Sequence, residues 1–207
     1  MRARGAPASS WLHQFSIVFM VPAPIHPLDT KGRPIILIGL MGCGKTTVGK
    51  ALSKRTGMPL LDTDAIIEEQ IGKPISQIFA EQGEAHFRAL ETALLRYLLY
   101  NPTPSPSIIS TGGGIVVRPE NRELLRKLGF TVWLNVSVNA LLVRTARSTT
   151  RPLLMNTDRR AVFTRLDEER RPFYKEAAHL WLEASRMDVN SVAVRVCEEA
   201  EHFFAAF

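Results

Sequence analysis

The stretch IILIGLMGCGKT spans Ile35 to Thr46 and joins an apolar run to a glycine-rich loop. From Gly39 onward it matches the phosphate-loop pattern G-x-x-x-x-G-K-[ST]. The apolar run at 35–38 predicts a buried strand, and residues 47–53 predict the helix that this loop requires. The stretch therefore predicts a nucleoside triphosphate site at the carboxyl end of a strand in an α/β sheet.

Each residue type in the loop has a physical role in binding phosphate. Glycines let backbone N–H groups converge on phosphate oxygens, and the positive N-terminus of the next helix faces the same anion. We expect Lys45 to reach the outer phosphates and the Thr46 hydroxyl to bind Mg²⁺. A plain glycine turn would explain neither side chain. The predicted ATP-binding residues of the loop are Gly42, Cys43, Gly44, Lys45, Thr46 and Thr47.

Length and composition indicate one globular domain of ordinary hydrophobicity. The chain has 207 residues, of which 45% are hydrophobic, and no apolar stretch approaches the roughly 18 residues needed to span a bilayer. We therefore expect no membrane partner. Two cysteines do not form a disulfide framework, which favours free thiols in a reducing compartment, the cytoplasm.

The net charge of +6 is concentrated in one region of the chain. Between positions 144 and 171, eight arginines stand against four acidic residues. Such a cluster suits a small polyanionic ligand, and without exposed aromatic residues between the basic ones we expect no nucleic-acid partner.

Residues 1–33 are predicted to be a disordered extension preceding a domain at 34–207. The segment has no acidic residue before Asp29 and is rich in Pro, Ala and Ser. A start codon assigned too early, with Met20 as the true start, explains the composition equally well. A transit peptide for organelle import and a signal peptide remain as further alternatives.

Strands and helices are predicted to alternate along the rest of the chain, which favours a parallel sheet covered on both faces. Asp64 is predicted to cap the helix after the second strand. The expected strands are 35–38, 58–61, 108–110, 131–136 and 179–184, and the expected helices are 47–53, 64–71, 74–81, 84–100, 119–128, 139–147, 165–175 and 192–204.

Five motifs follow one another in an order that resembles the shikimate kinase family. They are the phosphate loop, the acidic pair Asp62-x-Asp64, Phe87-Arg88-x-x-Glu91, the triplet Gly112-Gly113-Gly114, and Arg151-Pro152-Leu153-Leu154 together with Glu169-Arg170-x-Pro172-x-Tyr174. The resemblance covers roughly residues 34–190. It implies a phosphate-loop kinase fold like that of nucleoside monophosphate kinases, with a five-stranded parallel sheet in the order 2-3-1-4-5. It also implies ATP-dependent phosphorylation of the 3-hydroxyl of shikimate by a monomer.

The acidic pair is suited to two tasks in phosphoryl transfer, which depends mostly on positioning and charge neutralisation. Asp64 can accept a hydrogen bond from the acceptor hydroxyl and take its proton. The resemblance assigns Asp62 to Mg²⁺ through water. The third strand ends in Ser110-Thr111 rather than an acid, which leaves Asp62 and Thr46 as the metal candidates.

A carboxylated acceptor needs cationic partners, and planar guanidinium groups bind carboxylates through two hydrogen bonds. The resemblance assigns this role to Arg88 and Arg170, and places backbone N–H groups of the glycine triplet beside the acceptor ring. It further implies that Glu91 orients an arginine. Phe79 and Phe87 match positions that flank the ring, although plain core packing explains them equally well.

Residues 145–160 are predicted to form a lid over the phosphates, because arginines alternate there with polar residues. The resemblance implies that Arg151 contacts the transferred phosphoryl group and that Arg144 stacks on adenine. The predicted catalytic residues are thus Lys45, Asp64 and Arg151. The alternatives are a gluconate or other small-molecule kinase, which would lack the glycine triplet paired with the Arg170 motif, and a non-catalytic nucleotide-binding module.

Overall fold

The structure is a computed structural model that describes residues 28–101, 105–146 and 158–206. The predictions made for residues 1–27 and for the part of the lid at 147–157, which includes Arg151, lie outside the described residues.

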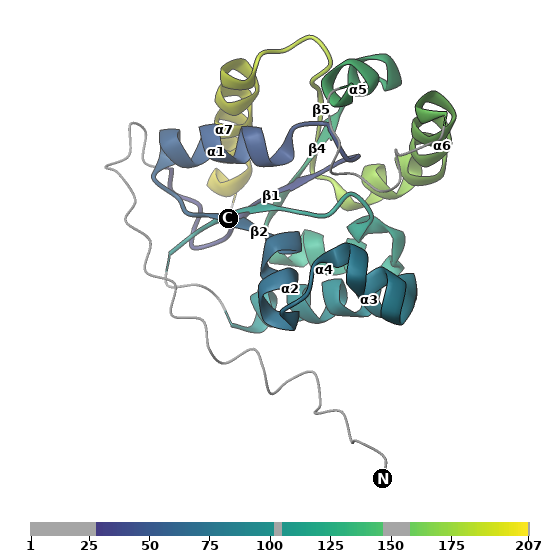
Figure 1. The fold of residues 1–207 in the computed structure, drawn as a ribbon. Helices are drawn as coiled ribbons and strands as arrows, with labels where there is room; N and C mark the ends of the chain where they lie inside the picture. The colour runs from purple at the N-terminus through teal and green to yellow at the C-terminus, as the bar shows by residue number, and fades with distance from the viewer. Residues whose placement is uncertain (1–27, 102–104, 147–157, 207) are drawn as a thin grey trace.

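A five-stranded parallel sheet forms the centre of the molecule, in the order β2-β3-β1-β4-β5 (Figure 1). The predicted fold class and strand order are therefore confirmed. All four residues of β1 are fully buried, as a central strand covered on both faces requires. The strands are β1 (Ile35–Ile38), β2 (Leu60–Asp62), β3 (Ile108–Ser110), β4 (Phe130–Asn135) and β5 (Leu180–Glu183).

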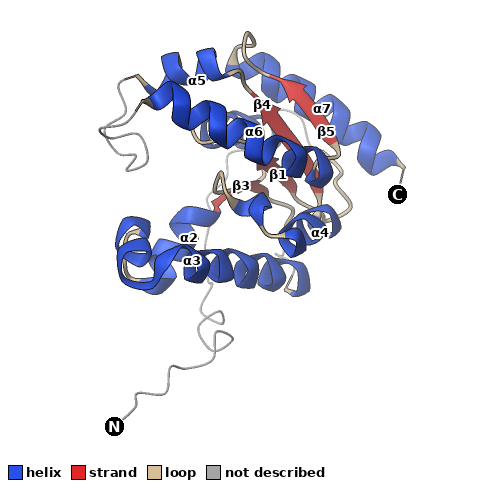
Figure 2. Cartoon of the chain, turned by 90° about the vertical axis from the view of Figure 1, so that its right-hand side faces the viewer, coloured by secondary structure: helices blue, strands red, loops and turns tan. Residues whose placement is uncertain are grey.

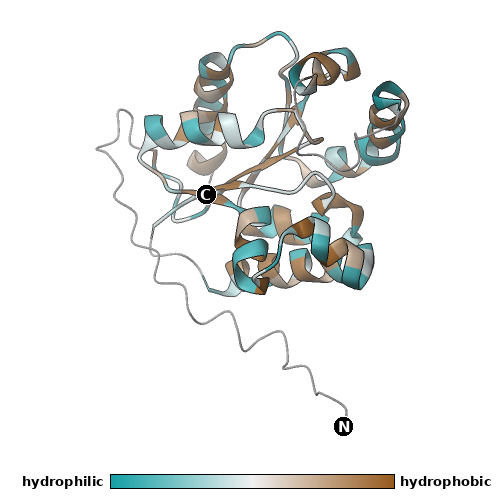
Figure 3. Ribbon diagram, viewed as in Figure 1, coloured by the Kyte–Doolittle hydropathy of each residue, from teal (hydrophilic) through white to brown (hydrophobic). Residues whose placement is uncertain are grey.

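Helices cover both faces of the sheet. Helices α1 and α7 pack together on one face, and α3 packs with α4 on the other (Figure 1). Apolar residues line the central strands and the inner helix surfaces, while the outward helix surfaces are largely hydrophilic (Figure 3). The helices are α1 (Lys45–Thr56), α2 (Thr63–Ile71), α3 (Ile75–Tyr100), the short 3₁₀ helix η2 (Ile115–Val117), α4 (Pro119–Leu128), α5 (Val138–Thr145), α6 (Arg159–Ala177) and α7 (Val189–Ala205). No helix among the described residues is long and apolar enough to cross a membrane.

Helix α3 contains a break where the sequence predicts two helices. Gly83 has φ 80° and ψ 170°, a conformation outside the helical region that glycine adopts readily. The segments on either side of Gly83 correspond to the predicted helices at 74–81 and 84–100. Their separate directions place Phe79 and Phe87 beside each other, with ring centroids 4.9 Å apart.

The predicted cap of α2 is wrong by two residues. Asp62 precedes the helix in an extended conformation, and its Oδ1 atom accepts hydrogen bonds from the backbone N–H groups of Asp64 and Ala65. Asp64 lies inside the first turn, where its own amide is one of the donors that the cap satisfies. The Asp64 carboxyl group is therefore not used in capping.

The carboxyl end of the predicted lid belongs to a helix. Helix α6 begins at Arg159 rather than at residue 165, and the side chain of Asp158 caps it by accepting from the N–H groups of Arg160 and Ala161. The Arg159 side chain also donates to the Thr145 carbonyl oxygen, at 3.0 Å. Arg159 and Arg160 are thus helical residues, because the cap at Asp158 extends the helix toward the predicted lid.

The last residues of the predicted extension contact the folded domain. Leu28 packs against the core, and Thr30 is 1% exposed. The Arg33 amide donates to the Thr30 carbonyl oxygen at 3.0 Å, which closes a turn before β1. The part from residue 28 onward therefore has a structural role that its composition does not reveal.

Deleting Met1 to Met20 is expected to leave the melting temperature and the rate of the expected phosphoryl transfer essentially unchanged, because that segment has no core-facing sequence pattern. Deleting residues 1–33 is the matched control and should lower the melting temperature, since it removes Leu28 and Thr30 from the core. Thermal unfolding and initial rates check both variants. A marked loss of stability in the shorter deletion would contradict the prediction.

Candidate active site

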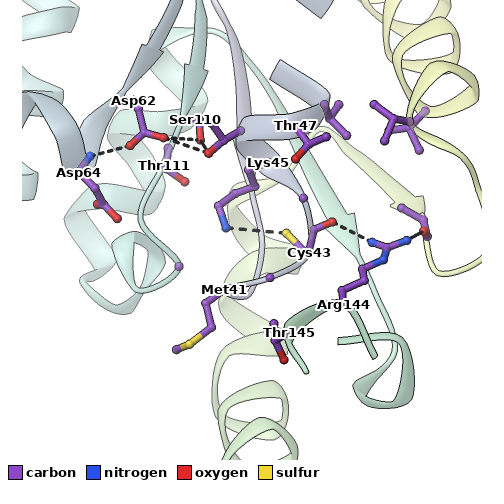
Figure 4. Close-up of a pocket in the computed structure, with 18 of the residues that line it drawn as sticks. Met41, Cys43, Lys45, Thr47, Asp62, Asp64, Ser110, Thr111, Arg144 and Thr145 are labelled. Atoms are coloured by element: carbon purple, nitrogen blue, oxygen red, sulfur yellow. Dashed lines mark hydrogen bonds between the residues drawn. The ribbon is translucent and has the colours of Figure 1, made fainter. Parts of the chain in front are cut away.

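A cleft of about 1320 Å³ opens at the carboxyl ends of the strands (Figure 4). The cleft is lined by the loop between β1 and α1. It is also lined by the ends of β2 and β3, the first turn of α3, helix α5 and the segment from β5 to α7. This edge of an open parallel sheet is where ligands bind, because several loops converge there.

The glycines of the phosphate loop have backbone conformations that other residues rarely adopt. Gly42 and Gly44 have φ values of 83° and 103°. The side chain of Lys45 folds back across the loop, where Nζ donates to the carbonyl oxygens of Gly39 and Leu40 at 2.8 and 3.1 Å. The predicted loop residues from Gly42 to Thr47 all line the cleft, so the structure brings them together at one site.

Three oxygen-bearing side chains meet beside the loop. Thr46 Oγ1 lies 3.1 Å from Asp62 Oδ2, and Ser110 Oγ lies 3.1 Å from the same carboxylate oxygen (Figure 4). The two hydroxyl groups are 3.2 Å apart. The structure thus joins the two predicted metal ligands and adds Ser110, which the sequence analysis did not count as a ligand. In the sequence, only the position of Ser110 at the end of β3 indicated that its hydroxyl could belong to the site.

This oxygen set suits Mg²⁺, which prefers hard oxygen ligands and is usually held by one or two carboxylates together with phosphates and water. Within the described residues, no group of three or more His, Cys, Asp or Glu side chains could hold a metal ion. The residues that could hold such an ion, together with the phosphates of a nucleotide, are Thr46 and Asp62.

Asp64 faces the cleft from the first turn of α2. Its Oδ1 atom is buried and has no hydrogen-bond partner among the described residues. Burial and, to a lesser extent, the nearby Asp62 raise the pKa of Asp64 to about 6, against the lowering effect of Lys45 and Arg88. A carboxyl group with a free oxygen and a pKa near neutrality is suited to accept a proton.

A buried ion pair lies behind Asp64, on α3. Arg88 donates to Glu91 Oε2 at 2.8 Å and to Glu84 Oε1 at 2.8 Å. Glu91 is fully buried, and this burial raises its pKa to about 7 against the lowering effect of Arg88. The guanidinium group of Arg88 is therefore held in one orientation by two carboxyl groups, as predicted for Glu91.

The glycine triplet passes between these groups at distances that exclude side chains. A Cβ atom added to Gly112 would lie 2.6 Å from Asp64 Oδ1 and 2.9 Å from Glu91 Oε1. One added to Gly114 would overlap the Arg88 guanidinium group. The amide of Gly112 is fixed by a 3.1 Å hydrogen bond to the buried Thr63 hydroxyl. Glycine is required here because two acidic residues and an arginine approach the backbone.

Helix α6 reaches the triplet from the other side. Arg170 donates to the Gly113 carbonyl oxygen at 3.1 Å, and the hydroxyl of Tyr174 donates to the same oxygen at 2.5 Å. Arg88 and Arg170, far apart in the sequence, thus both lie against the triplet. The sequence analysis gave Tyr174 no role in the site, although this residue stands in the motif that contains Arg170.

The two phenylalanines differ in their surroundings. Phe87 is 3% exposed and belongs to the core, while Phe79 is only partly buried and lines the cleft. The core-packing interpretation therefore holds for Phe87, and Phe79 faces the side where an acceptor would lie.

Arg144 bridges two loops that line the cleft. Its guanidinium group donates to the carbonyl oxygen of Cys43 at 3.0 Å and to that of Ala184 at 2.8 Å (Figure 4). This joins the phosphate loop to the segment after β5. The side chain of Cys43 is only 1% exposed, so this residue faces the cleft mainly through its backbone.

Comparisons with known proteins point to one family. The family model described as shikimate kinase matches residues 41–201. The chain is 42% identical to shikimate kinase of Marinomonas sp. over 168 residues, which cover 81% of this chain and 92% of that protein. It is 40% identical to the Burkholderia pseudomallei enzyme, over 81% of this chain and 89% of that protein.

Solved structures extend the likeness to the fold. The structure of shikimate kinase from Acinetobacter baumannii in complex with shikimate superimposes with a TM-score of 0.74 at 35% identity, covering 81% of this chain and 92% of that one. A gluconokinase from Sinorhizobium meliloti, at 17% identity and a TM-score of 0.51, shares the fold alone. With the family model covering most of the chain and curated relatives at about 40% identity, this chain belongs to the shikimate kinase family.

Proposed function

We propose that this chain transfers the γ-phosphoryl group of Mg-ATP to the 3-hydroxyl of shikimate. The observation that carries the proposal is the position of Asp64, whose Oδ1 atom is buried without a hydrogen-bond partner among the described residues. On one side are the phosphate loop and the oxygens of Thr46 and Asp62. On the other are Arg88 and the glycine triplet.

The phosphate side supports binding and charge neutralisation. Backbone N–H groups of the loop and the N-terminus of α1 bind the phosphates, while Lys45 leaves its loop carbonyls for the outer phosphate oxygens. Thr46 and Asp62 would hold Mg²⁺, which would supply positive charge against the charge that develops during transfer. Arg144, which donates to the carbonyl oxygens of Cys43 and Ala184, is proposed to stack on adenine. Arg151, outside the described residues, is proposed to contact the transferred phosphoryl group.

The acceptor side supports recognition of a carboxylated ring. Arg88 lies against Gly114 and Arg170 against Gly113, and both guanidinium groups bind the acceptor carboxylate. Gly112, Gly113 and Gly114 allow the ring to approach the backbone, because no side chain intervenes. Asp64 then accepts the proton of the acceptor hydroxyl, and the loss of this proton makes the hydroxyl oxygen a stronger nucleophile.

Cys43 and Cys197 are both free and buried, which supports a reducing compartment such as the cytoplasm.

The proposal is tested by ADP release measured in parallel with shikimate, gluconate and nucleoside monophosphates as acceptors. Release that depends on shikimate alone is expected. Faster ADP release with gluconate or a nucleoside monophosphate would show that this compound, rather than shikimate, is the acceptor. ATP binding without release for any acceptor would instead indicate a nucleotide-binding module that is not an enzyme.

The pH dependence of the rate follows from the raised pKa of Asp64, about 6. Because the ionised carboxylate accepts the proton, kcat/KM for shikimate should fall about tenfold per pH unit below pH 6 and be level above it. The measurement uses saturating Mg-ATP. The KM for Mg-ATP at each pH serves as the control, since phosphate groups titrate near pH 6 as well. A profile that stays level down to pH 5 would contradict the assignment of Asp64.

A further inference from the structure

Two side chains of one helix share a single backbone acceptor in the site. The Gly113 carbonyl oxygen accepts from the Tyr174 hydroxyl at 2.5 Å and from Arg170 Nη1 at 3.1 Å. Both donors belong to α6 and lie one helical turn apart, so they reach the same atom from one helix face. The tyrosine bond is the shorter of the two.

The ring of Tyr174 has little freedom to move. It is fully buried and stacks on Trp133 of β4, with ring centroids 5.6 Å apart and an angle of 19° between the planes. Helix α6 lies beside β4 (Figure 2) and also contacts η2. Burial raises the pKa of Tyr174 above its usual range, so the phenol remains a protonated donor. The hydroxyl therefore offers a fixed donor to Gly113.

Gly113 also lies against the phosphate loop. A Cβ atom added to Gly113 would be 3.1 Å from the Met41 amide nitrogen and 3.4 Å from the Gly39 carbonyl oxygen. The peptide of Gly113 is thus placed between the loop that binds phosphate and the side of the cleft that faces the acceptor. A shift of this peptide would move the glycine triplet relative to both.

We propose that Tyr174 is a positioning residue for the acceptor: its hydroxyl holds the Gly113 carbonyl and leaves the remaining donors of Arg170 aimed at the acceptor carboxylate. This inference rests on the proposed function, since it assumes a carboxylated acceptor bound by Arg170. Without the hydroxyl, Arg170 becomes the only side-chain donor to that carbonyl among the described residues. Its guanidinium group is then drawn toward the backbone, and the triplet loses its fixed position.

Tyr174→Phe removes the hydroxyl and keeps the ring stacked on Trp133. We expect the KM for shikimate to rise about fivefold, kcat to fall less than about threefold, and the KM for ATP to stay within about twofold. Thr131→Val is the matched control. It removes another buried hydroxyl, which donates to the Leu125 carbonyl oxygen at 3.1 Å away from the cleft. The control should lower the melting temperature without a change in either KM.

A double-mutant cycle with Arg170→Lys separates positioning from general stability. If Tyr174 acts through Arg170, the two substitutions will raise the KM for shikimate by less than the product of their separate effects. An unchanged KM for shikimate in Tyr174→Phe, with a loss of stability like that of the control, would overturn the inference. Effects that multiply fully in the double variant would overturn it as well.

Hydrogen exchange of the backbone amides at 110–118 distinguishes this inference from the proposed function. Faster exchange at Gly113 and Gly114 in Tyr174→Phe, but not in Thr131→Val, is expected. If the unmodified enzyme did not phosphorylate shikimate, the proposed function would fall, and the exchange rates would still decide whether Tyr174 holds the triplet. Equal exchange rates at Gly113 and Gly114 in Tyr174→Phe and Thr131→Val would show that Tyr174 does not position the triplet, whatever the acceptor is.

Discussion

Asp64→Asn is expected to lower kcat at least about 100-fold while leaving the affinity for ATP unchanged. Asparagine has the same shape but neither the charge nor the basicity of the carboxylate, so it cannot take the proton of the acceptor hydroxyl. Asp64 does not cap its helix, because Asp62 does, and the substitution should therefore leave α2 intact. Steady-state ADP release gives kcat, and titration calorimetry gives the dissociation constant of ATP.

Asp29→Asn is the control for this substitution. Asp29 lies on the surface, where it pairs with Lys31 outside the cleft, so its replacement should leave kcat unchanged. A rate for Asp64→Asn close to that of the unmodified enzyme would show that another group takes the proton. Loss of ATP binding in the same variant would instead place Asp64 at the nucleotide.

Arg170→Lys is expected to raise the KM for shikimate about tenfold or more and to leave the KM for ATP within about threefold. Lysine keeps the charge but loses the planar pair of donors that fits a carboxylate. Loss of a charge-assisted hydrogen bond costs roughly 1.5–3 kcal/mol, which corresponds to a factor of about ten or more. Initial rates over both substrate concentrations give the two constants.

The neighbouring arginine provides a matched control. Arg171 pairs with Asp167 through Nε and Nη2, at 3.2 and 2.7 Å, and does not contact the glycine triplet. Arg171→Lys should therefore change neither KM. If Arg170→Lys raised both constants together, Arg170 would belong to the nucleotide side, and the proposed acceptor would lose its main support.

The sequence alone predicted the fold because its signals are local. The phosphate loop needs a strand before it and a helix after it, and both are encoded within some twenty contiguous residues. The glycine triplet is likewise contiguous, and its place after a strand indicates an approach of ligand or side chain to the backbone. The order of the motifs along the chain was enough to identify the family and the strand order.

Local signals were insufficient where two roles suit one residue type. Asp62 and Asp64 are both acidic and lie only two residues apart where β2 gives way to α2, so either one could cap α2 by composition. The capping geometry requires N–H donors two and three residues beyond the acceptor, and only the backbone conformation at Asp62 meets it. The start of α6 was misplaced for a similar reason, since Asp158 resembles a loop residue until its hydrogen bonds are known.

Motif and strand order were thus determined by the sequence, while the contacts between motifs were decided by the tertiary structure. Ser110 joins Asp62 because parallel pairing of β2 with β3 places these two residues in register. Tyr174 reaches Gly113 because α6 packs beside η2 and β4, a contact across 61 positions of the chain. The physical reason is that a hydrogen bond depends on distance and direction in space, and residues far apart in sequence acquire both only when the elements that carry them pack together.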